Sequence, residues 1–278
     1  MIRPVISLYA SAARPENWLR LYDSIKHNSC EFEIVFVGPN APAIQLPKQF
    51  NYIKSYTKPV QCAEIAAINA KGKYLLHCVD DLVFKDKKAL DKILEYYERN
   101  INDVSELILS PRLMRDGEPY LESNYKLYPE LERCPYVPIS IFIKKSLYYD
   151  LGGYDINFIA SMADTDLAYR GVTEARATIE FVEVFVEESK TDSDGSTLFE
   201  DYRHNDLTLL KNLWFKDKRF LCKRSRNFFG FSKSNILTIT QGRKGRWWYI
   251  GAYLDKLGVL QVHRLLRRVV RKFYKVLS

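Results

Sequence analysis

The first 80 residues alternate between short apolar runs and segments with helical character. Residues 17–25 place apolar side chains along one helical face, residues 63–70 are a second helical segment, and Gly72 follows it as a helix stop. A chain that repeats strand and helix in this way folds into a doubly wound, mostly parallel sheet. We therefore expect an α/β fold. The apolar runs that resemble buried strands are residues 4–9, 33–37, 51–56 and 74–79.

The chain beyond residue 80 continues the alternation with longer interruptions. Residues 112–136, rich in charge, Pro and Tyr, predict a long loop, and the polar residues 191–197 predict a mobile segment. The 278 residues provide for one sizeable α/β domain and an appendage. We place the domain at residues 1–212, its halves meeting near residue 110. Further strands are expected at residues 107–109, 139–143 and 178–186, and further helices at 88–99, at 144–151 and from 164 onwards.

Charge is distributed unevenly along the chain. Residues 213–278 hold 17 Lys and Arg against two acids, whereas the preceding part holds 25 Lys and Arg against 32 Asp and Glu. Residues 259–278 predict a helix whose apolar face is bordered by Arg and Lys, and the aromatic run 247–249 precedes it. Such a helix suits an anionic membrane surface. The alternative is a helix docked on the main domain or, in a homo-oligomer, on a second copy. No recognition motif supports a nucleic-acid partner.

The ends of the chain and its cysteines bear on its compartment. The sequence contains no stretch of 18 uncharged apolar residues, and its N-terminus leads into the first strand without a basic and then apolar leader. We therefore expect neither a membrane-spanning helix nor a secretion signal. Five dispersed cysteines without CxxC spacing are typical of reduced, structural thiols. These features predict a cytoplasmic protein that the basic helix could bring to the inner face of the membrane.

An acidic pair, Asp80 and Asp81, follows directly after the fourth apolar run. Doubly wound sheets bind ligands outside the carboxyl ends of their strands, so the pair is expected to lie in a ligand crevice. Carboxylate oxygens are the ligands that Mg²⁺ and Mn²⁺ prefer, and a cation held there would neutralise a diphosphate leaving group. The alternative is a solvated turn after a buried strand, where Asp is common.

A second acidic pattern, Asp164 and Asp166, stands at the start of a predicted helix. One carboxylate in this position can cap the helix, because helix N-termini favour negative charge. Two acids in three residues exceed what capping requires. A carboxylate in the crevice could instead take the proton from an attacking hydroxyl, so both interpretations stay open.

Two further residues are candidates at the edge of the predicted site. Glu187 closes a predicted strand and could supply a metal ligand, and His204 could reach a phosphate or a metal; solvent exposure is the alternative for both. The chain contains no GxxxxGK[ST], GxGxxG, HExxH or GxSxG run. This excludes P-loop kinases, Rossmann dehydrogenases, zincins and serine hydrolases of the usual pattern.

Four segments, taken in order, resemble the family 2 glycosyltransferases of the GT-A fold. They are PVISLYASAARPENWLRLYDSI, EIVFVGPN, AEIAAINAKGKYLLHCVDD and LGGYDINFIASMADTDLAYRG. The resemblance covers about residues 3–190, and its most specific part is KGKYLL…DD followed by GGYD…DTDLAYR. It implies a GT-A catalytic domain over residues 1–212, with a nucleotide-sugar half over about 1–110, an acceptor half over about 111–212, and a basic, helical C-terminal extension over 213–278.

The resemblance also implies roles for individual residues. Asp81 would bind the metal, Mn²⁺ or Mg²⁺, and Asp80 would contact the nucleotide or its sugar. Asp164 would be the catalytic base, with Asp166 in a structural role. Such enzymes invert the anomeric centre in one in-line displacement without a covalent intermediate. The remaining contacts to the nucleotide sugar would come from the ends of the first two strands, at Ala10, Ser11, Gly38 and Asn40.

Three positions depart from the family's pattern. Ala10 to Ala12 stand where Thr-x-Asn is usual, Gly38 stands where an Asp commonly reads the nucleobase, and Glu187 or Glu188 replaces a frequent histidine. The first two departures leave the base identity open, so UDP is expected as the commonest nucleotide of the family.

The expected function is therefore metal-dependent, inverting transfer of a sugar from a nucleotide donor to a saccharide or lipid-linked acceptor, in the synthesis of a surface polysaccharide. The acceptor would lie against residues 112–136 and 190–204. A sugar-phosphate nucleotidyltransferase of the same fold is one alternative, but it would need a Gly-rich loop after the first strand, which residues 10–15 lack. A non-catalytic binding or scaffold protein is the other, because the nucleobase positions are altered.

Overall fold

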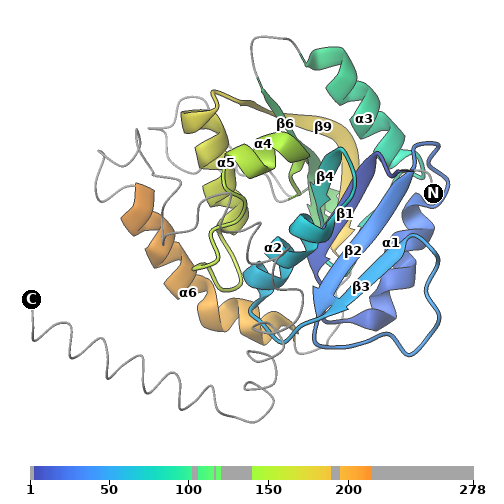
Figure 1. Ribbon diagram of the computed structural model, residues 1–278, viewed down its shortest axis with the longest axis horizontal. Helices are drawn as coiled ribbons and strands as arrows, with labels where there is room; N and C mark the ends of the chain where they lie inside the picture. Colours follow the sequence, from blue (N-terminus) through green and yellow to red (C-terminus); the bar gives the residue numbers. More distant parts are fainter. Residues whose placement is uncertain (1–2, 102–105, 116, 120–139, 189–194, 215–278) are drawn as a thin grey trace, which may run out of the picture.

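Four parallel strands form the N-terminal part of a nine-stranded sheet in the computed structural model (Figure 1). Their order is β3–β2–β1–β4: the chain builds outward from β1 and then returns to place β4 at the other edge of β1. This reversal is a topological switch point, where such sheets bind ligands. The strands are β1 (Ile6–Ser11), β2 (Phe32–Gly38), β3 (Phe50–Lys54) and β4 (Tyr74–His77). The structure describes residues 3–101, 106–115, 117–119, 140–188 and 195–214.

The sheet continues beyond β4 with mixed pairing. β8 pairs antiparallel with both β4 and β6, and β6 pairs parallel with β9. β5 pairs antiparallel with β9, and β7 pairs antiparallel with β6. The expected α/β fold is confirmed, and both predicted halves contribute to the same sheet. These strands are β5 (Leu82–Phe84), β6 (Leu107–Arg115), β7 (Glu118–Pro119), β8 (Phe142–Lys144) and β9 (Thr178–Glu188).

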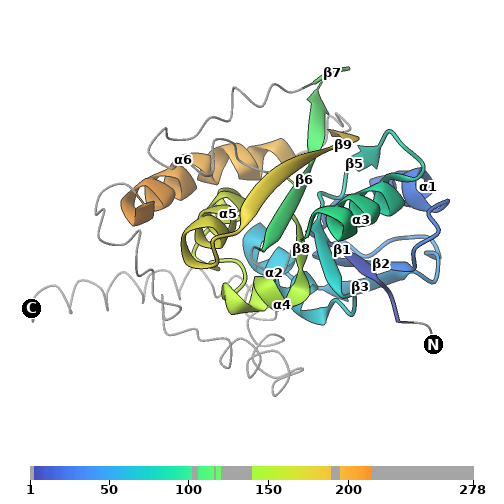
Figure 2. The ribbon, with the colours of Figure 1, turned by 90° about the horizontal axis from the view of Figure 1, so that it is seen from above.

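Helices cover both faces of the sheet (Figures 1 and 2). α1 and α3 pack with one apolar cluster, and α2, α4, α5 and α6 pack with the other. The amphipathic pattern explains α1 and α3, whereas α2 is apolar nearly all round because almost all of it is buried. The helices are α1 (Trp18–Ile25), α2 (Pro59–Asn69), α3 (Ala89–Asn100), α4 (Lys145–Asp150), α5 (Ala163–Glu174) and α6 (Gly195–Trp214), and a 3₁₀ turn, η1 (Pro15–Asn17), precedes α1.

The structure corrects two expectations about loops. Residues 112–115 continue β6, and β7 follows shortly afterwards, so the predicted loop over 112–136 begins as a sheet extension. Residues 195–197 open α6, although the sequence predicted a mobile segment over 191–197. Residues 120–139 and 189–194 lie outside the described part of the chain.

The C-terminal extension is described only at its start. α6 runs two residues beyond the expected domain boundary, and Leu213 and Trp214 pack in the core. Residues 215–278, including the predicted basic helix at 259–278, lie outside the described residues, so its partner stays a prediction. Within the described ranges, no helix has the length and apolar character needed to cross a bilayer.

The buried end of α1 fixes the segment that follows β1. Trp18 is fully buried and lies 5.1 Å from the Phe36 ring and 5.4 Å from the Tyr52 ring. Loss of such a side chain costs about 3–5 kcal/mol of folding free energy. Pro15 opens η1 with the backbone angle that a helical turn requires. Arg14, directly before this turn, is therefore anchored to the body of the sheet.

Candidate active site at the switch point

The loops after β1 and β4 meet at the switch point, where Asp80 holds the first of them. Asp80 is 2% exposed. Its Oδ2 accepts hydrogen bonds from the backbone N–H groups of Ala13 and Arg14, both at 2.7 Å. Its Oδ1 accepts from Nε and NH2 of Arg14 at 3.0 and 2.5 Å. Both oxygens are thus engaged, and Asp80 is the residue that orders this loop.

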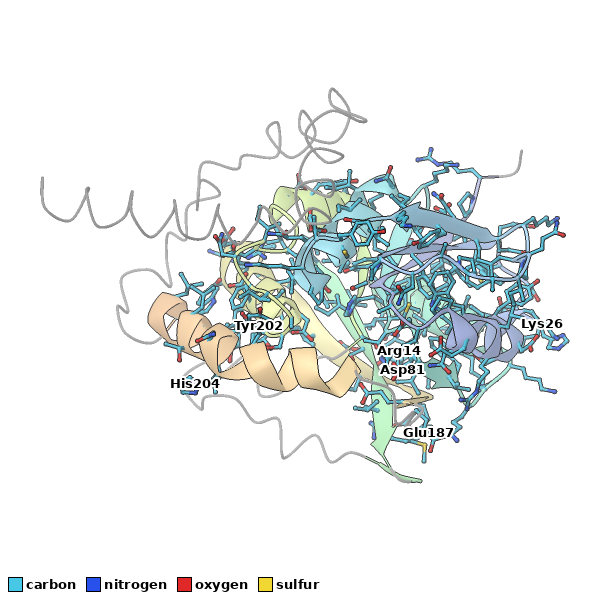
Figure 3. All side chains as sticks on the ribbon, turned by 90° about the horizontal axis from the view of Figure 1, so that it is seen from below. Arg14, Lys26, Asp81, Glu187, Tyr202 and His204 are labelled. Carbon is cyan, nitrogen blue, oxygen red and sulfur yellow. The ribbon has the colours of Figure 1, made fainter. Side chains whose placement is uncertain are left out.

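Asp81 is the second acid of the pair and lies close to Arg14 (Figure 3). Its Oδ2 contacts NH1 of Arg14 at 2.7 Å. The pKa of Asp81 is raised to about 6: burial raises it most, the negative charges of Asp80 and Glu188 also raise it, and Arg14 lowers it. A raised carboxyl pKa means that the ionised form lacks sufficient positive charge nearby.

The charge balance of this site fits a divalent cation. The Arg14 guanidinium pairs with both Asp80 and Asp81, so one positive charge is shared between two carboxylates, and the charge of Glu188 also acts on Asp81. Their oxygens are the hard ligands that Mg²⁺ and Mn²⁺ prefer. Within the described ranges, no group of three or more His, Cys, Asp or Glu side chains could hold a metal ion. Asp81 would therefore be the protein's ligand, and diphosphate oxygens and water would have to complete the shell.

Gly38 and Asn40 hold the same loop from the β2 side. A Cβ atom at Gly38 would lie 1.7 Å from the carbonyl oxygen of Ala12, so only glycine permits this approach. The N–H of Ala12 donates to the Val37 carbonyl at 2.9 Å, and Nδ2 of Asn40 donates to the Ala13 carbonyl at 2.7 Å. These two positions therefore shape the crevice wall.

The four predicted nucleotide contacts lie at the ends of β1 and β2. Ala10 packs in the core, so only its backbone could reach a ligand, while Ser11 is half-buried and Asn40 is exposed. The structure brings Ser11, Gly38 and Asn40 to the edge where the acid pair lies. Their contact with a nucleotide stays a prediction.

Asp164 lies in the first turn of α5, where the backbone reverses sharply. The preceding Met162 adopts a left-handed conformation with φ of 64°. The Thr165 N–H donates to Oδ1 of Asp164 at 2.7 Å. The carboxyl group is buried, although the residue as a whole keeps partial exposure, and burial raises its pKa to about 6. A buried carboxylate with few hydrogen bonds is a stronger base than an exposed one.

Tyr154 connects Asp164 with the ends of β1 and β4. The hydroxyls of Tyr154 and Tyr9 lie 3.1 Å apart, and the ring of His77 stands perpendicular to that of Tyr154 with centroids 5.6 Å apart. The charge of Asp164 contributes to raising the pKa of Tyr154. Tyr9 is on β1 and His77 ends β4 three residues before Asp80, so Asp164 acts electrostatically on a tyrosine that packs against both strands.

Two buried acids that the sequence did not single out support this arrangement. Oε2 of Glu64 accepts from the Tyr148 hydroxyl at 2.5 Å and from the Tyr154 N–H at 2.7 Å, and burial raises the pKa of Glu64 to about 7. A lone Glu in the Ala-rich run 63–70 was the available signal. Asp206 on α6 accepts from three consecutive backbone N–H groups, at 2.8 to 3.0 Å, in the segment 159–161 that leads into α5.

Asp166 lies in a different environment from Asp164. It is fully buried, and its Oδ2 accepts from Nε and NH2 of Arg170 at 3.0 and 2.9 Å. Its Oδ1 accepts from the indole N–H of Trp214 at 2.8 Å. The guanidinium of Arg170 also donates to the carbonyls of Leu151 and Gly153. Asp166 therefore ties α5 to α6 and to the turn before it.

The remaining candidates, Glu187 and His204, have no contact with the acid pair among the described interactions. Glu187 forms an ion pair with Lys85, and it is the next residue, Glu188, whose charge acts on Asp81. His204 is exposed on α6, well apart from Asp81 (Figure 3). Successive side chains of a strand point to opposite faces of the sheet. Which of Glu187 and Glu188 faces Asp81 therefore depends on the register of β9. Whether either residue has a role with a ligand stays a prediction.

Solved structures of other proteins share the fold that carries this site. No family model and no curated protein matches the sequence. The mannosyltransferase PcManGT from Pyrobaculum calidifontis, in complex with GDP-Man and Mn²⁺, superposes with a TM-score of 0.55 at 13% identity over 96% of this chain and 83% of that one. TarS 1–349 from S. aureus superposes with a TM-score of 0.52 at 14% identity over 91% of this chain and 79% of that one. The chain has a GT-A-like fold.

This result confirms the predicted fold class for the described residues. A further TarS structure, in complex with UDP, gives a TM-score of 0.50 at 13% identity over 87% of this chain and 75% of that one. The likeness concerns the fold, since sequence identity is this low. The inverting family 2 mechanism stays a prediction from the sequence.

Proposed function

We propose that this protein is a glycosyltransferase that takes a sugar from a nucleotide-sugar donor. The observation that carries the proposal is the presence of two unlike carboxylate sites, one in the loop after β4 and one in the first turn of α5. The acid pair, Asp80 and Asp81, is short of positive charge, whereas Asp164 is buried alone with a raised pKa. The first suits a cation with a diphosphate, and the second suits a proton acceptor. The structures with GDP-Man and UDP support this donor class.

Asp81 would hold the divalent cation, Mn²⁺ or Mg²⁺. The bound ion would neutralise the diphosphate as it leaves. A cation beside Asp81 favours its ionised form, which removes the destabilisation that burial imposes on that carboxylate. Asp80, with both oxygens engaged by the loop after β1, keeps the pair aligned toward the donor.

Asp164 would act as the base in an inverting displacement. With a pKa of about 6 it is ionised at neutral pH and yet a better proton acceptor than an ordinary Asp. The acceptor O–H bond breaks toward Asp164 while the oxygen forms a bond to the anomeric carbon. The bond from that carbon to the diphosphate breaks, and the diphosphate leaves with the electron pair. One such displacement on the face opposite the leaving group inverts the anomeric configuration.

The donor and acceptor follow from the sequence and from the comparisons. A UDP-sugar is the favoured donor, with GDP-sugars as the other class to test, and the acceptor is a saccharide or a lipid-linked saccharide of a surface polysaccharide. The basic helix at 259–278 would hold the enzyme peripherally on the cytoplasmic face of an anionic membrane.

The test is a donor panel of UDP- and GDP-sugars, assayed for hydrolysis and transfer with and without Mn²⁺. We expect metal-dependent turnover of one donor by the wild type and a loss of at least about 100-fold in Asp81→Asn. Asp23→Asn, the same change at an exposed position paired with Lys26, is the matched control and should leave turnover unchanged. No metal-dependent binding or turnover of any donor would refute the proposal.

A further inference from the structure

Arg14 spans the acid pair with its guanidinium (Figure 3). Its Nε and NH2 contact Oδ1 of Asp80 at 3.0 and 2.5 Å, and its NH1 contacts Oδ2 of Asp81 at 2.7 Å. The Arg14 side chain is 23% exposed, so a ligand in the crevice could reach it. A planar guanidinium with five donors can hold two carboxylates at once, which the point charge of a Lys cannot do in the same way.

The two sides of the guanidinium are held unequally. On the Asp80 side, the carboxylate also accepts from the backbone N–H groups of Ala13 and Arg14, so this contact is part of the loop itself. The contact with Asp81 is a single ion pair at the opposite end of the guanidinium. The Asp81 carboxylate can therefore turn away from NH1 while Nε and NH2 remain on Asp80.

A divalent cation and NH1 compete for Asp81. If a cation bound Asp81, it would stand close to the guanidinium, and the two positive charges would repel each other. In the absence of a nucleotide, NH1 would then lose a charged partner. With a nucleoside diphosphate present, a phosphate oxygen replaces that partner, and guanidinium groups bind such oxygens well.

We propose that Arg14 is a positioning residue that couples cation binding to donor binding. In the free protein Arg14 neutralises the acid pair; when the cation occupies Asp81, NH1 transfers to an oxygen of the donor's diphosphate. This inference rests on the proposed function and adds to it how the cation and the donor affect each other's binding. The cation alone binds weakly, the nucleoside diphosphate alone binds weakly, and each strengthens the other by the same factor, as linkage requires.

The test measures Mn²⁺ binding by calorimetry, alone and with saturating UDP or GDP, whichever the wild type binds more tightly. The variants are Arg14→Met and Arg14→Lys. Lys26→Met is the matched control, because Lys26 is an exposed cation at the end of α1, paired with Asp23 and apart from the acid pair (Figure 3).

The expected pattern is specific to a competing guanidinium. In the wild type, the nucleotide tightens Mn²⁺ binding by about tenfold or more. In Arg14→Met, Mn²⁺ alone binds about threefold or more tighter than in the wild type, and the factor by which the nucleotide tightens Mn²⁺ binding is about threefold or more smaller than in the wild type, the remainder coming from direct contact between Mn²⁺ and the diphosphate. Arg14→Lys gives intermediate values, and Lys26→Met matches the wild type. A role in packing alone would instead lower the melting temperature without increasing the affinity for Mn²⁺.

Two results would overturn the inference. One is an Arg14→Met variant that melts like the wild type and binds Mn²⁺ alone no tighter. The other is undiminished coupling in Arg14→Lys, which decides the matter if Arg14→Met does not fold. A wild type that binds neither UDP nor GDP would overturn the proposed function instead, and the comparison with Mn²⁺ alone would still show whether Arg14 competes for the cation site.

Discussion

Asp164→Asn should make the protein more stable and nearly inactive at the same time. Burial raises the pKa of Asp164 from 3.8 to about 6, so the folded state disfavours the ionised carboxylate. Each pKa unit corresponds to about 1.36 kcal/mol, so ionised Asp164 costs the folded state about 3 kcal/mol at pH 7.5. An Asn side chain carries no charge, and its Oδ1 can still accept the hydrogen bond from the Thr165 N–H.

The sign of the effect follows from the direction of the shift. The pKa of Asp164 is higher in the folded state than in the unfolded state. Protonated Asp164 therefore leaves the folded state at its full stability below the unfolded pKa, and this stability is lost as the pH rises through about 6. The gain from Asp164→Asn should therefore be about 3 kcal/mol at pH 7.5 and about 1.5 kcal/mol at pH 5. Urea unfolding followed by tryptophan fluorescence at both pH values measures it.

The kinetic half of the prediction uses the same group. The kcat/KM of the wild type should rise about tenfold per pH unit below pH 6 and level off above it, and Asp164→Asn should lose about 10²- to 10⁴-fold. Asp23→Asn, which removes a carboxylate from an exposed position, should change neither stability nor rate. An Asp164→Asn variant that is destabilised at pH 7.5, or that keeps activity within tenfold of the wild type, would show that this carboxylate is neither strained by burial nor the base.

Three other perturbations test the surrounding structure. Arg170→Met leaves the buried Asp166 without its ion pair and should cost about 3–5 kcal/mol in urea unfolding; a loss under 1 kcal/mol would contradict the structural role. Gly38→Ala puts a methyl group 1.7 Å from the Ala12 carbonyl, so we expect weaker nucleotide binding by calorimetry, and unchanged affinity would show that the loop can shift. Deletion of residues 259–278 should abolish sedimentation with anionic liposomes while soluble turnover continues, and unchanged sedimentation would refute the anchoring prediction.

The parallel half of the sheet was predictable because its strands are apolar runs bounded by turn signals or helical segments. Each of β1 to β4 lies within about three residues of its predicted position at both ends. In the second half, the predicted strands correspond to the start of β6, to β8 and to β9, whereas β5 and β7 were missed because two or three residues are too few to show a periodicity. β5 has only three residues, and Leu82 follows the acid pair directly, so nothing in the sequence separates this strand from a turn.

The positions of Asp80, Asp81 and Asp164 were accessible from the sequence because each stands next to a recognisable element. The sheet topology brings the carboxyl ends of parallel strands together, independently of the conformation of the loops that follow them. The environments of these residues were not accessible. Asp164 and Asp166 are two residues apart, yet one is a carboxylate with a raised pKa and the other is neutralised by Arg170. A helix turns the two side chains to different faces, and Asp166 pairs with Arg170 on its own face while Trp214 of α6 completes its partners.

The position of Arg14 beside the acid pair was likewise not predictable from the sequence. In the sequence it is one basic residue among 42, located before a Pro, with no pattern that relates it to an acid pair 66 residues later. Three local constraints place it there: the close approach at Gly38, the 3₁₀ turn that Pro15 opens, and the burial of Trp18. None of these involves charge. The electrostatics of the crevice therefore depend on how the apolar face of α1 packs, so a substitution in the core beneath α1 should alter cation binding without touching a charged residue.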